Sequence, residues 1–274
     1  MTWPYRSLGV RQRPPVVFLH GFMGAGEDWL PIAGMCAGRY FCLLPDLPGH
    51  GRNIDLPLAQ PLDFDFVVDG LRAWLDRLEP RPVGLVGYSM GGRLALYAAL
   101  KFPGRFAALV LEGANPGLAD PGQRGQRAEL DAQRAEALLR EGLAAFVEGW
   151  YEMDLFRSLQ DRPQLLKQIK AKRKRNDARR AARVIRELSP GRQPPLWDRL
   201  DELSLPVLLV AGALDGKYSR LAAQMAARIS GAGLAVVPGA GHNVHLEQPE
   251  QFAGALIDFL QKSVAWGDDR DRSG

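Results

Sequence analysis

Gly87-Tyr88-Ser89-Met90-Gly91 is the stretch of this chain that decides its fold. It follows an apolar run at 82–86 and precedes residues 92–101, where apolar side chains recur at helical spacing. A G-x-S-x-G sequence between a strand and a helix is typical of a nucleophile elbow, which presents its serine on a sharp turn. Such a turn leaves no room for side chains beside the serine, so glycine is expected on either side of it. A plain turn with a helix-capping serine would use the same residues, and the five residues alone leave both interpretations open.

Further short apolar runs predict the other strands of a sheet. They lie at residues 16–19, 41–44, 106–112, 205–212 and 234–238. Helical spacing of apolar residues between some of these runs, as at 64–78, predicts helices that connect the strands. Strands that alternate with helices favour a parallel, doubly wound sheet. The predicted class is therefore α/β, with a mostly parallel sheet.

The pattern becomes purely helical in the segment 116–197. A polar loop is predicted at 117–127 and helices at 128–140, 142–150 and 162–188. An insertion after the strand that follows the elbow would lie over the catalytic end of the sheet as a lid. The predicted domains are a core made of residues 1–115 and 198–274 and a helical lid made of residues 116–197.

The composition is ordinary for a soluble globular protein, with 274 residues, 46% hydrophobic and 24% charged. Proline or glycine breaks the longest apolar runs well short of the roughly 20 residues of a membrane span. Residues 1–6 lack the basic start and apolar stretch of a signal peptide. Cys36 and Cys42 are too few for a disulfide framework and indicate buried thiols. We expect a cytoplasmic protein with no membrane partner, as a monomer or weak homo-oligomer.

The net charge of +4 is mild, but basic residues dominate between 167 and 186. Nucleic-acid binding, an exposed helix face and a pocket for an anionic substrate are three interpretations of such a run. The run lacks interleaved aromatic residues and stands alone in a balanced chain, so nucleic acid ranks last. We expect no nucleic-acid partner.

Three residues with complementary chemistry each follow a predicted strand. They are Ser89, Asp215 and His242, in the chain order typical of hydrolases with a catalytic triad. A serine hydroxyl is a poor nucleophile and a poor base at pH 7, so it needs an imidazole, and a buried carboxylate fixes that imidazole's tautomer. The backbone N–H groups of Phe22, after the first core strand, and Met90, after the serine, are candidates for an oxyanion hole. This coincidence at strand ends favours a catalytic site over a plain turn.

Other polar residues have simpler interpretations. His50 is expected to be structural, since no triad-type carboxylate accompanies it, and Asp46 is an alternative triad acid that lies too early in the chain. His242 and His245 form an H-x-x-H pair, but no further ligands cluster nearby. We therefore predict no metal site and a core position for His245.

Several motifs together resemble the α/β-hydrolase superfamily, over nearly the whole chain. They are H-G-F-M-G at 20–24, D-L-P-G-H-G at 46–51, G-Y-S-M-G-G-R at 87–93 and G-A-G-H at 239–242. More narrowly, the elbow with segments 112–118, 150–159, 193–197 and 241–247 resembles the 2-succinyl-6-hydroxy-2,4-cyclohexadiene-1-carboxylate synthase family of menaquinone and phylloquinone biosynthesis. The segments in the helical insertion make the narrower resemblance specific.

This resemblance implies a lyase that eliminates pyruvate from 2-succinyl-5-enolpyruvyl-6-hydroxy-3-cyclohexene-1-carboxylate without a cofactor. It also implies that the serine, backed by its histidine, acts as a base, so that no acyl-enzyme forms. The substrate is a small polyanion, and arginine pairs with carboxylates in a two-pronged manner. The substrate-binding residues that the resemblance implies are Arg93, Tyr88, Trp150, Arg173 and Arg127, with Arg124 as the alternative to Arg127.

Two other function classes remain open from the sequence. A hydrolase of esters, thioesters or carbon–carbon bonds would use the same triad to form a covalent acyl-serine at Ser89. A non-catalytic binding protein could keep the fold, although an intact triad and oxyanion loop argue against it.

Overall fold

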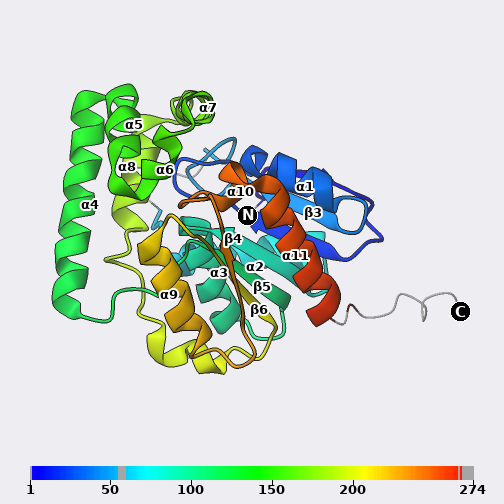
Figure 1. Ribbon diagram of the computed structural model, residues 1–274. Helices are drawn as coiled ribbons and strands as arrows, with labels where there is room; N and C mark the ends of the chain where they lie inside the picture. The colour runs from blue at the N-terminus through cyan, green and yellow to red at the C-terminus, as the bar shows by residue number, and fades with distance from the viewer. Residues whose placement is uncertain (1, 55–59, 265, 267–274) are drawn as a thin grey trace, which may run out of the picture.

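Seven strands form one sheet in the computed structural model, which describes residues 2–54, 60–264 and 266 (Figure 1). The strand order is β1-β3-β2-β4-β5-β6-β7. Only β1 runs antiparallel to its neighbour β3, and the other described pairs are parallel. The strands are β1 Tyr5–Leu8, β2 Pro15–Leu19, β3 Phe41–Pro45, β4 Val83–Tyr88, β5 Phe106–Glu112, β6 Val207–Gly212 and β7 Gly233–Val237.

Helices cover both faces of this sheet. In β2, Val17 and Leu19 pack into one apolar cluster, with α2, α3 and part of α9, whereas Val16 and Phe18 pack into another, with α1 and α11. Because successive side chains of a strand point to opposite faces, this division is what a doubly wound sheet requires. These helices are α1 Leu30–Cys36, α2 Phe64–Leu78, α3 Met90–Lys101, α9 Gly216–Ala226 and α11 Pro249–Ser263.

Local signals in the sequence explain where these helices begin and end. At the start of α2 the Asp63 carboxylate accepts a hydrogen bond from the N–H of Phe66 at 2.8 Å, a standard N-cap. The helix ends at Leu78, two residues before Pro80, and Glu79 is extended as a residue before proline prefers.

A second group of helices lies between β5 and β6. Figure 1 shows α4, α5, α7 and α8 in green, gathered to one side of the sheet. They pack around two apolar clusters of their own, one of which includes Met23 from the loop after β2. The helices are α4 Pro121–Glu141, α5 Leu143–Glu152, α6 Arg157–Gln160, α7 Pro163–Arg173 and α8 Ala178–Glu187. We call this group the lid, and its division from the core at residues 116 and 197 stays a prediction.

The remaining elements are short. They are the 3-10 helices η1 Gly26–Trp29, η2 Asp154–Phe156 and η3 Trp197–Glu202, and the single-turn helix α10 Val244–Glu247.

Three departures from the sequence-based elements concern the helical insertion and the edge of the sheet. The expected loop at 117–127 is wrong in its second half, because Asp120 caps α4 by accepting from Gln123 N at 2.7 Å and Pro121 occupies the first turn. The single helix expected at 162–188 is two helices, since Asp177 caps a new start by accepting from Arg180 N at 2.9 Å. The edge strand β1 was not expected, and its paired residues include Arg6 and Ser7.

Among the described residues, no helix combines the length and the apolar character needed to cross a bilayer.

Replacing Gly91 by alanine should destabilise the protein. A Cβ there would lie 2.4 Å from the carbonyl oxygen of Leu19 and 2.6 Å from that of His20, both backbone atoms that have no room to yield. We expect the free energy of unfolding in urea to fall by about 1–3 kcal/mol. Gly149→Ala is the matched control, since Gly149 is exposed in α5 with open space around it, and alanine should add about 0.5–1 kcal/mol there. Equal effects of the two substitutions would contradict the steric argument.

Candidate active site

The turn from β4 into α3 holds Ser89 in an unusual backbone conformation. Its φ of 49° and ψ of −107° lie outside the ordinary regions for a residue with a side chain. Gly87 and Gly91 permit this turn, because a Cβ on Gly87 would lie 2.5 Å from the carbonyl oxygen of Gly91. The serine therefore stands at the tip of a strained turn, at the N-terminal end of α3.

Ser89, His242 and Asp215 form one continuous chain of contacts. Nδ1 of His242 lies 2.8 Å from Oδ2 of Asp215, and Nε2 lies 3.2 Å from Oγ of Ser89. A carboxylate only accepts hydrogen bonds, so Nδ1 carries the proton and Nε2 is left to accept from the serine hydroxyl. Asp215 and His242 are both buried. The arrangement allows the serine to pass its proton to the histidine.

Two further carboxylates hold the loop around His242. Glu247 accepts hydrogen bonds from the N–H groups of Gly241 and Asn243, at 3.0 and 3.1 Å, on either side of the histidine. Glu112 accepts from the backbone N–H of His245 at 3.1 Å and from its Nδ1 at 2.8 Å. The ring of His245 stacks on Trp29. His245 therefore lies in the core, and its ring is engaged by Glu112 and Trp29.

The loop after β2 brings Phe22 to the same site. Gly24 N donates to Gly21 O at 3.0 Å, which closes a turn around Phe22 and Met23. His20 supports the loop, since its Nδ1 donates to Gly21 O at 2.8 Å and its Nε2 accepts from Leu47 N at 3.0 Å. Phe22, Ser89 and Met90 all line one pocket. The oxyanion-hole role of the Phe22 and Met90 N–H groups stays a prediction.

This pocket has a volume of about 480 Å³ and lies between the strand ends and the lid. Ser89, Asp215 and Gly241 line it from the core, and Trp150, Val184 and Leu188 line it from the lid. Positive charge dominates its ionisable lining, which contains Arg93, Arg127, Arg134, Arg157 and Lys217 against Asp131, Asp154 and Asp215. The site is therefore suited to a small anion with apolar parts.

Arg93 is buried at this pocket with neutral partners. Its guanidinium donates to Leu188 O at 3.0 Å and to Gln193 Oε1 at 3.4 Å, and lies over the ring of Phe64. Burial lowers its pKa to about 10, so it stays charged at neutral pH. A buried cation bonded to neutral acceptors is costly, and an anionic ligand would offset that cost.

Asp131 organises two more arginines on the pocket wall. It is fully buried and accepts from Nε of Arg127 at 2.8 Å, from Arg134 at 2.9 Å and from the Ser189 hydroxyl at 2.7 Å. The Arg134 guanidinium also lies over the Trp150 ring, 5.6 Å from its centroid. Asp131 and Arg134 were not among the residues expected from the sequence, although their spacing from Arg127 places all three on one face of α4.

Three other predicted substrate residues lie away from the pocket lining. The Tyr88 hydroxyl donates to Oδ1 of Asn243, and burial raises its pKa. Arg173 donates to Asp28 at 2.6 Å and to the Tyr151 hydroxyl at 3.3 Å. Arg124, the alternative to Arg127, donates to the carbonyls of Leu118 and Ala119. Trp150 and Arg127, in contrast, do line the pocket.

Several basic residues of the run between 167 and 186 form ion pairs within the protein. Lys170 and Lys174 contact Glu148 at 2.6 and 2.5 Å, and Lys172 lies 3.7 Å from Asp28. Asp46, the alternative triad acid, accepts instead from the backbone N–H groups of Gly26 and Arg52, at 2.8 and 3.0 Å. In the part of the chain that the structure describes, no three His, Cys, Asp or Glu side chains gather in a way that could hold a metal ion.

Comparison with known proteins assigns the family. The α/β hydrolase family matches residues 16–255. A putative 2-succinyl-6-hydroxy-2,4-cyclohexadiene-1-carboxylate synthase of Bacillus subtilis is 37% identical over 89% of each chain. The enzyme of that name from Serratia proteamaculans is 36% identical over 92% of this chain and 95% of its own. This chain belongs to that synthase family of α/β hydrolases. The fold and family expected from the sequence are confirmed.

Further similarities agree with the synthase family and show its wider relations. The chloroplastic protein PHYLLO of Arabidopsis thaliana is 35% identical over 90% of this chain, which spans 15% of PHYLLO's length. The solved structure of MenH from S. aureus has a TM-score of 0.91 at 30% identity, covering 96% of this chain and 99% of that one. A thermophilic esterase from Thermogutta terrifontis has a TM-score of 0.83 at 25% identity, covering 96% and 94%.

His50, beside this site, should make stability depend on pH. Its Nδ1 donates to Pro48 O at 3.2 Å, and its Nε2 is buried without a hydrogen-bond partner among the described residues. Burial, reinforced by the nearby His20, lowers its pKa from 6.5 to about 3. Below pH 6.5 the His50 imidazole is protonated in the unfolded chain but stays neutral in the folded chain. The stabilisation that is present above pH 6.5 is therefore lost as the pH falls.

We expect this residue to reduce the free energy of unfolding by about 1.6 kcal/mol between pH 6.5 and pH 5. Urea unfolding of the wild type and of His50→Asn at the two pH values measures it, with the substitution giving the smaller fall. Identical pH dependence of the two proteins would contradict a neutral, buried His50.

Proposed function

We propose that this chain eliminates pyruvate from 2-succinyl-5-enolpyruvyl-6-hydroxy-3-cyclohexene-1-carboxylate to give 2-succinyl-6-hydroxy-2,4-cyclohexadiene-1-carboxylate. The observation that carries the proposal is a serine–histidine–aspartate chain that opens into a pocket walled by arginines. The names of the synthase relatives, which match most of this chain, support the same reaction. A menaquinone or phylloquinone pathway follows as the setting.

Ser89 is the base in this proposal. Its hydroxyl proton passes to Nε2 of His242, and the oxygen removes a proton from the substrate ring. Asp215 stabilises the imidazolium that forms. The electron pair left on the ring forms the new double bond as the bond to the enolpyruvyl oxygen breaks. The leaving enolpyruvate takes up a proton and becomes pyruvate, so that no water and no cofactor are consumed.

The Phe22 and Met90 N–H groups act on the charge that develops during proton removal. In this proposal they donate to the oxygen that becomes enolate-like. In an ester hydrolase, the equivalent N–H groups would donate to the oxyanion of the tetrahedral intermediate. Fixed donors in a site partly closed by the lid favour this charge more than mobile water would.

The substrate's carboxylates explain the arginines. Arg93 lies on α3, whereas Arg127 and Arg134 lie on α4, so they are able to hold carboxylates at different ends of one ligand. Arg127 uses Nε for Asp131, and its two terminal nitrogens donate to no other group among the described residues, which leaves them for a carboxylate. Trp150 gives the ring of the substrate an apolar contact.

A second function, ester hydrolysis, is favoured by the similarity to the Thermogutta terrifontis esterase. In a hydrolase, Ser89 would attack a carbonyl and form an acyl-serine. Intact-mass spectrometry after mixing with an activated ester distinguishes the two, because only the hydrolase accumulates the covalent adduct.

A cytoplasmic location and a monomeric or weakly self-associating state remain part of this proposal. Light scattering across a concentration series measures the second.

Pyruvate release tests the proposed function. The purified protein should convert the cyclohexene substrate and release one pyruvate per turnover, measured with a lactate dehydrogenase coupled assay. Ser89→Ala should lower kcat by a factor of about 10³ or more, since removal of a triad serine leaves only the residual catalysis of the binding site. Ser204→Ala, at an exposed serine on the loop before β6, is the control. Absence of turnover by the wild type would exclude the proposed reaction.

Removing the pocket arginines should weaken substrate binding. Arg127→Met and Arg134→Met should each raise KM by about 10-fold or more, because charged hydrogen bonds contribute about 1.5–3 kcal/mol. Arg140→Met is the matched control on the same helix, where the side chain is 68% exposed. Unchanged KM in both variants would show that the substrate carboxylates lie elsewhere.

A further inference from the structure

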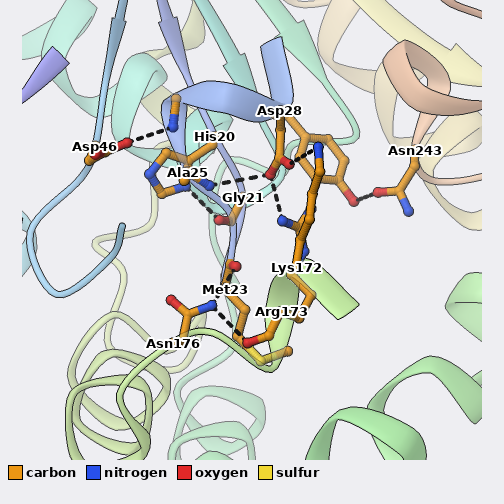
Figure 2. Close-up of polar contacts among 12 residues, drawn as sticks. His20, Gly21, Met23, Ala25, Asp28, Asp46, Lys172, Arg173, Asn176 and Asn243 are labelled. Atoms are coloured by element: carbon orange, nitrogen blue, oxygen red, sulfur yellow. Dashed lines mark hydrogen bonds and ion pairs between the residues drawn. The ribbon is translucent and has the colours of Figure 1, made fainter. Parts of the chain in front are cut away.

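The lid reaches the loop after β2, which carries Phe22 and Met23, at a small polar junction (Figure 2). Asn176, after α7, donates from Nδ2 to Met23 O at 2.9 Å and also to Arg173 O at 3.0 Å. Met23 directly follows Phe22, whose N–H is the proposed oxyanion donor. A lid side chain thus contacts the backbone one residue beyond that donor.

The backbone at Met23 needs such support. Its φ of 58° lies in the left-handed region, and Met23 is the third residue of the turn closed by Gly24 N and Gly21 O. That turn position with positive φ normally carries glycine or asparagine. A methionine held there is strained, and surrounding contacts must keep it in place.

Arg173 connects the lid to Asp28 in η1, which follows the same loop. Its guanidinium lies 2.6 Å from Oδ2 of Asp28, and both side chains are more than nine-tenths buried. The same Asp28 oxygen accepts from Ala25 N at 3.2 Å, at the start of η1. Burial alone would raise the pKa of Asp28, but Arg173 and His20 hold it below its usual range. The pair is therefore ionised and joins the end of α7 to η1.

Apolar contacts complete the junction. Met23 is buried in the lid cluster with Val147, Tyr151 and Phe156. The ring of Phe22 meets Trp150 edge-on, at a centroid distance of 5.1 Å. Both residues of the turn are thus covered by the lid.

We propose that Asn176 and Arg173 are positioning residues, which act through Met23 and Asp28 to hold the Phe22 N–H in its catalytic orientation. This inference rests on the proposed function, and it gives Arg173 a different role from the substrate contact expected from the sequence. Arg173 is absent from the pocket lining, and its guanidinium is engaged by Asp28 and Tyr151.

Substitutions at Asn176 test the proposal. Asn176→Ala and Asn176→Asp should each lower kcat about 10-fold with KM changed less than two-fold, since removal of an oxyanion donor itself costs about 10²–10³. Aspartate keeps the size of asparagine but loses the N–H donor, so a packing role alone would leave Asn176→Asp at the wild-type rate. Arg175→Ala, at an exposed side chain nearby, is the control.

Arg173→Lys separates positioning from substrate binding. It keeps the charge but loses the planar fork. Positioning predicts a lower kcat at nearly constant KM, whereas a substrate-binding arginine predicts a raised KM. A raised KM with unchanged kcat in the Asn176 and Arg173 variants would overturn the proposal.

Hydrogen–deuterium exchange gives a readout that does not depend on turnover. Peptides that cover residues 20–28 should exchange faster in Asn176→Ala than in the wild type and in Arg175→Ala. Unchanged exchange would overturn the proposal even if the enzyme is active. Faster exchange in a protein without pyruvate release would support the junction and reject the proposed reaction instead.

Discussion

The close approach of α3 to the ends of β2 and β4 is the constraint on which the site depends. A Cβ on Gly91 would fall 2.4 Å from Leu19 O, and one on Gly87 would fall 2.5 Å from Gly91 O. Only because these positions lack side chains does the chain turn sharply enough to raise Ser89 above the sheet. The Phe22 loop begins immediately after Leu19 and lines the same pocket. Backbone contact therefore sets the distance between Ser89, the proposed base, and the proposed oxyanion donors Phe22 and Met90.

Sequence spacing was informative for the core because each proposed catalytic residue follows a strand. A parallel sheet brings the carboxyl ends of its strands to one edge, so placing Ser89, Asp215 and His242 after three strands was enough to bring them together. The strand β1 was missed because its four residues, including Arg6, have no apolar run and are fixed by pairing with β3. Predicting β1 would require knowing that residues 5–8 pair with β3, which the local sequence does not indicate.

The helical structure of the lid was predictable from the sequence, but the direction in which its side chains point was not. The family resemblance implied that Arg173 contacts the substrate, whereas in the structure Arg173 pairs with Asp28, which lies 145 residues away in the sequence. Asp131 was missed for a related reason, since an acidic residue on a polar helix usually faces water. Its complete burial depends on Ser189 and the two arginines that converge on it. Such convergence is a property of helix packing, which spacing along the chain does not record.

Asp215 performs two tasks with its two oxygens. Oδ2 faces Nδ1 of His242, while Oδ1 accepts from the N–H of Tyr218 and so caps α9. Rate measurements on Asp215 variants therefore combine an altered imidazole with a loosened helix start. Asparagine at this position has one oxygen acceptor, so it would either cap α9 or accept from His242, but not both. Substitution of Asp215 is therefore expected to change the free energy of unfolding together with the turnover rate, so the effect on the chemical step is not measured alone.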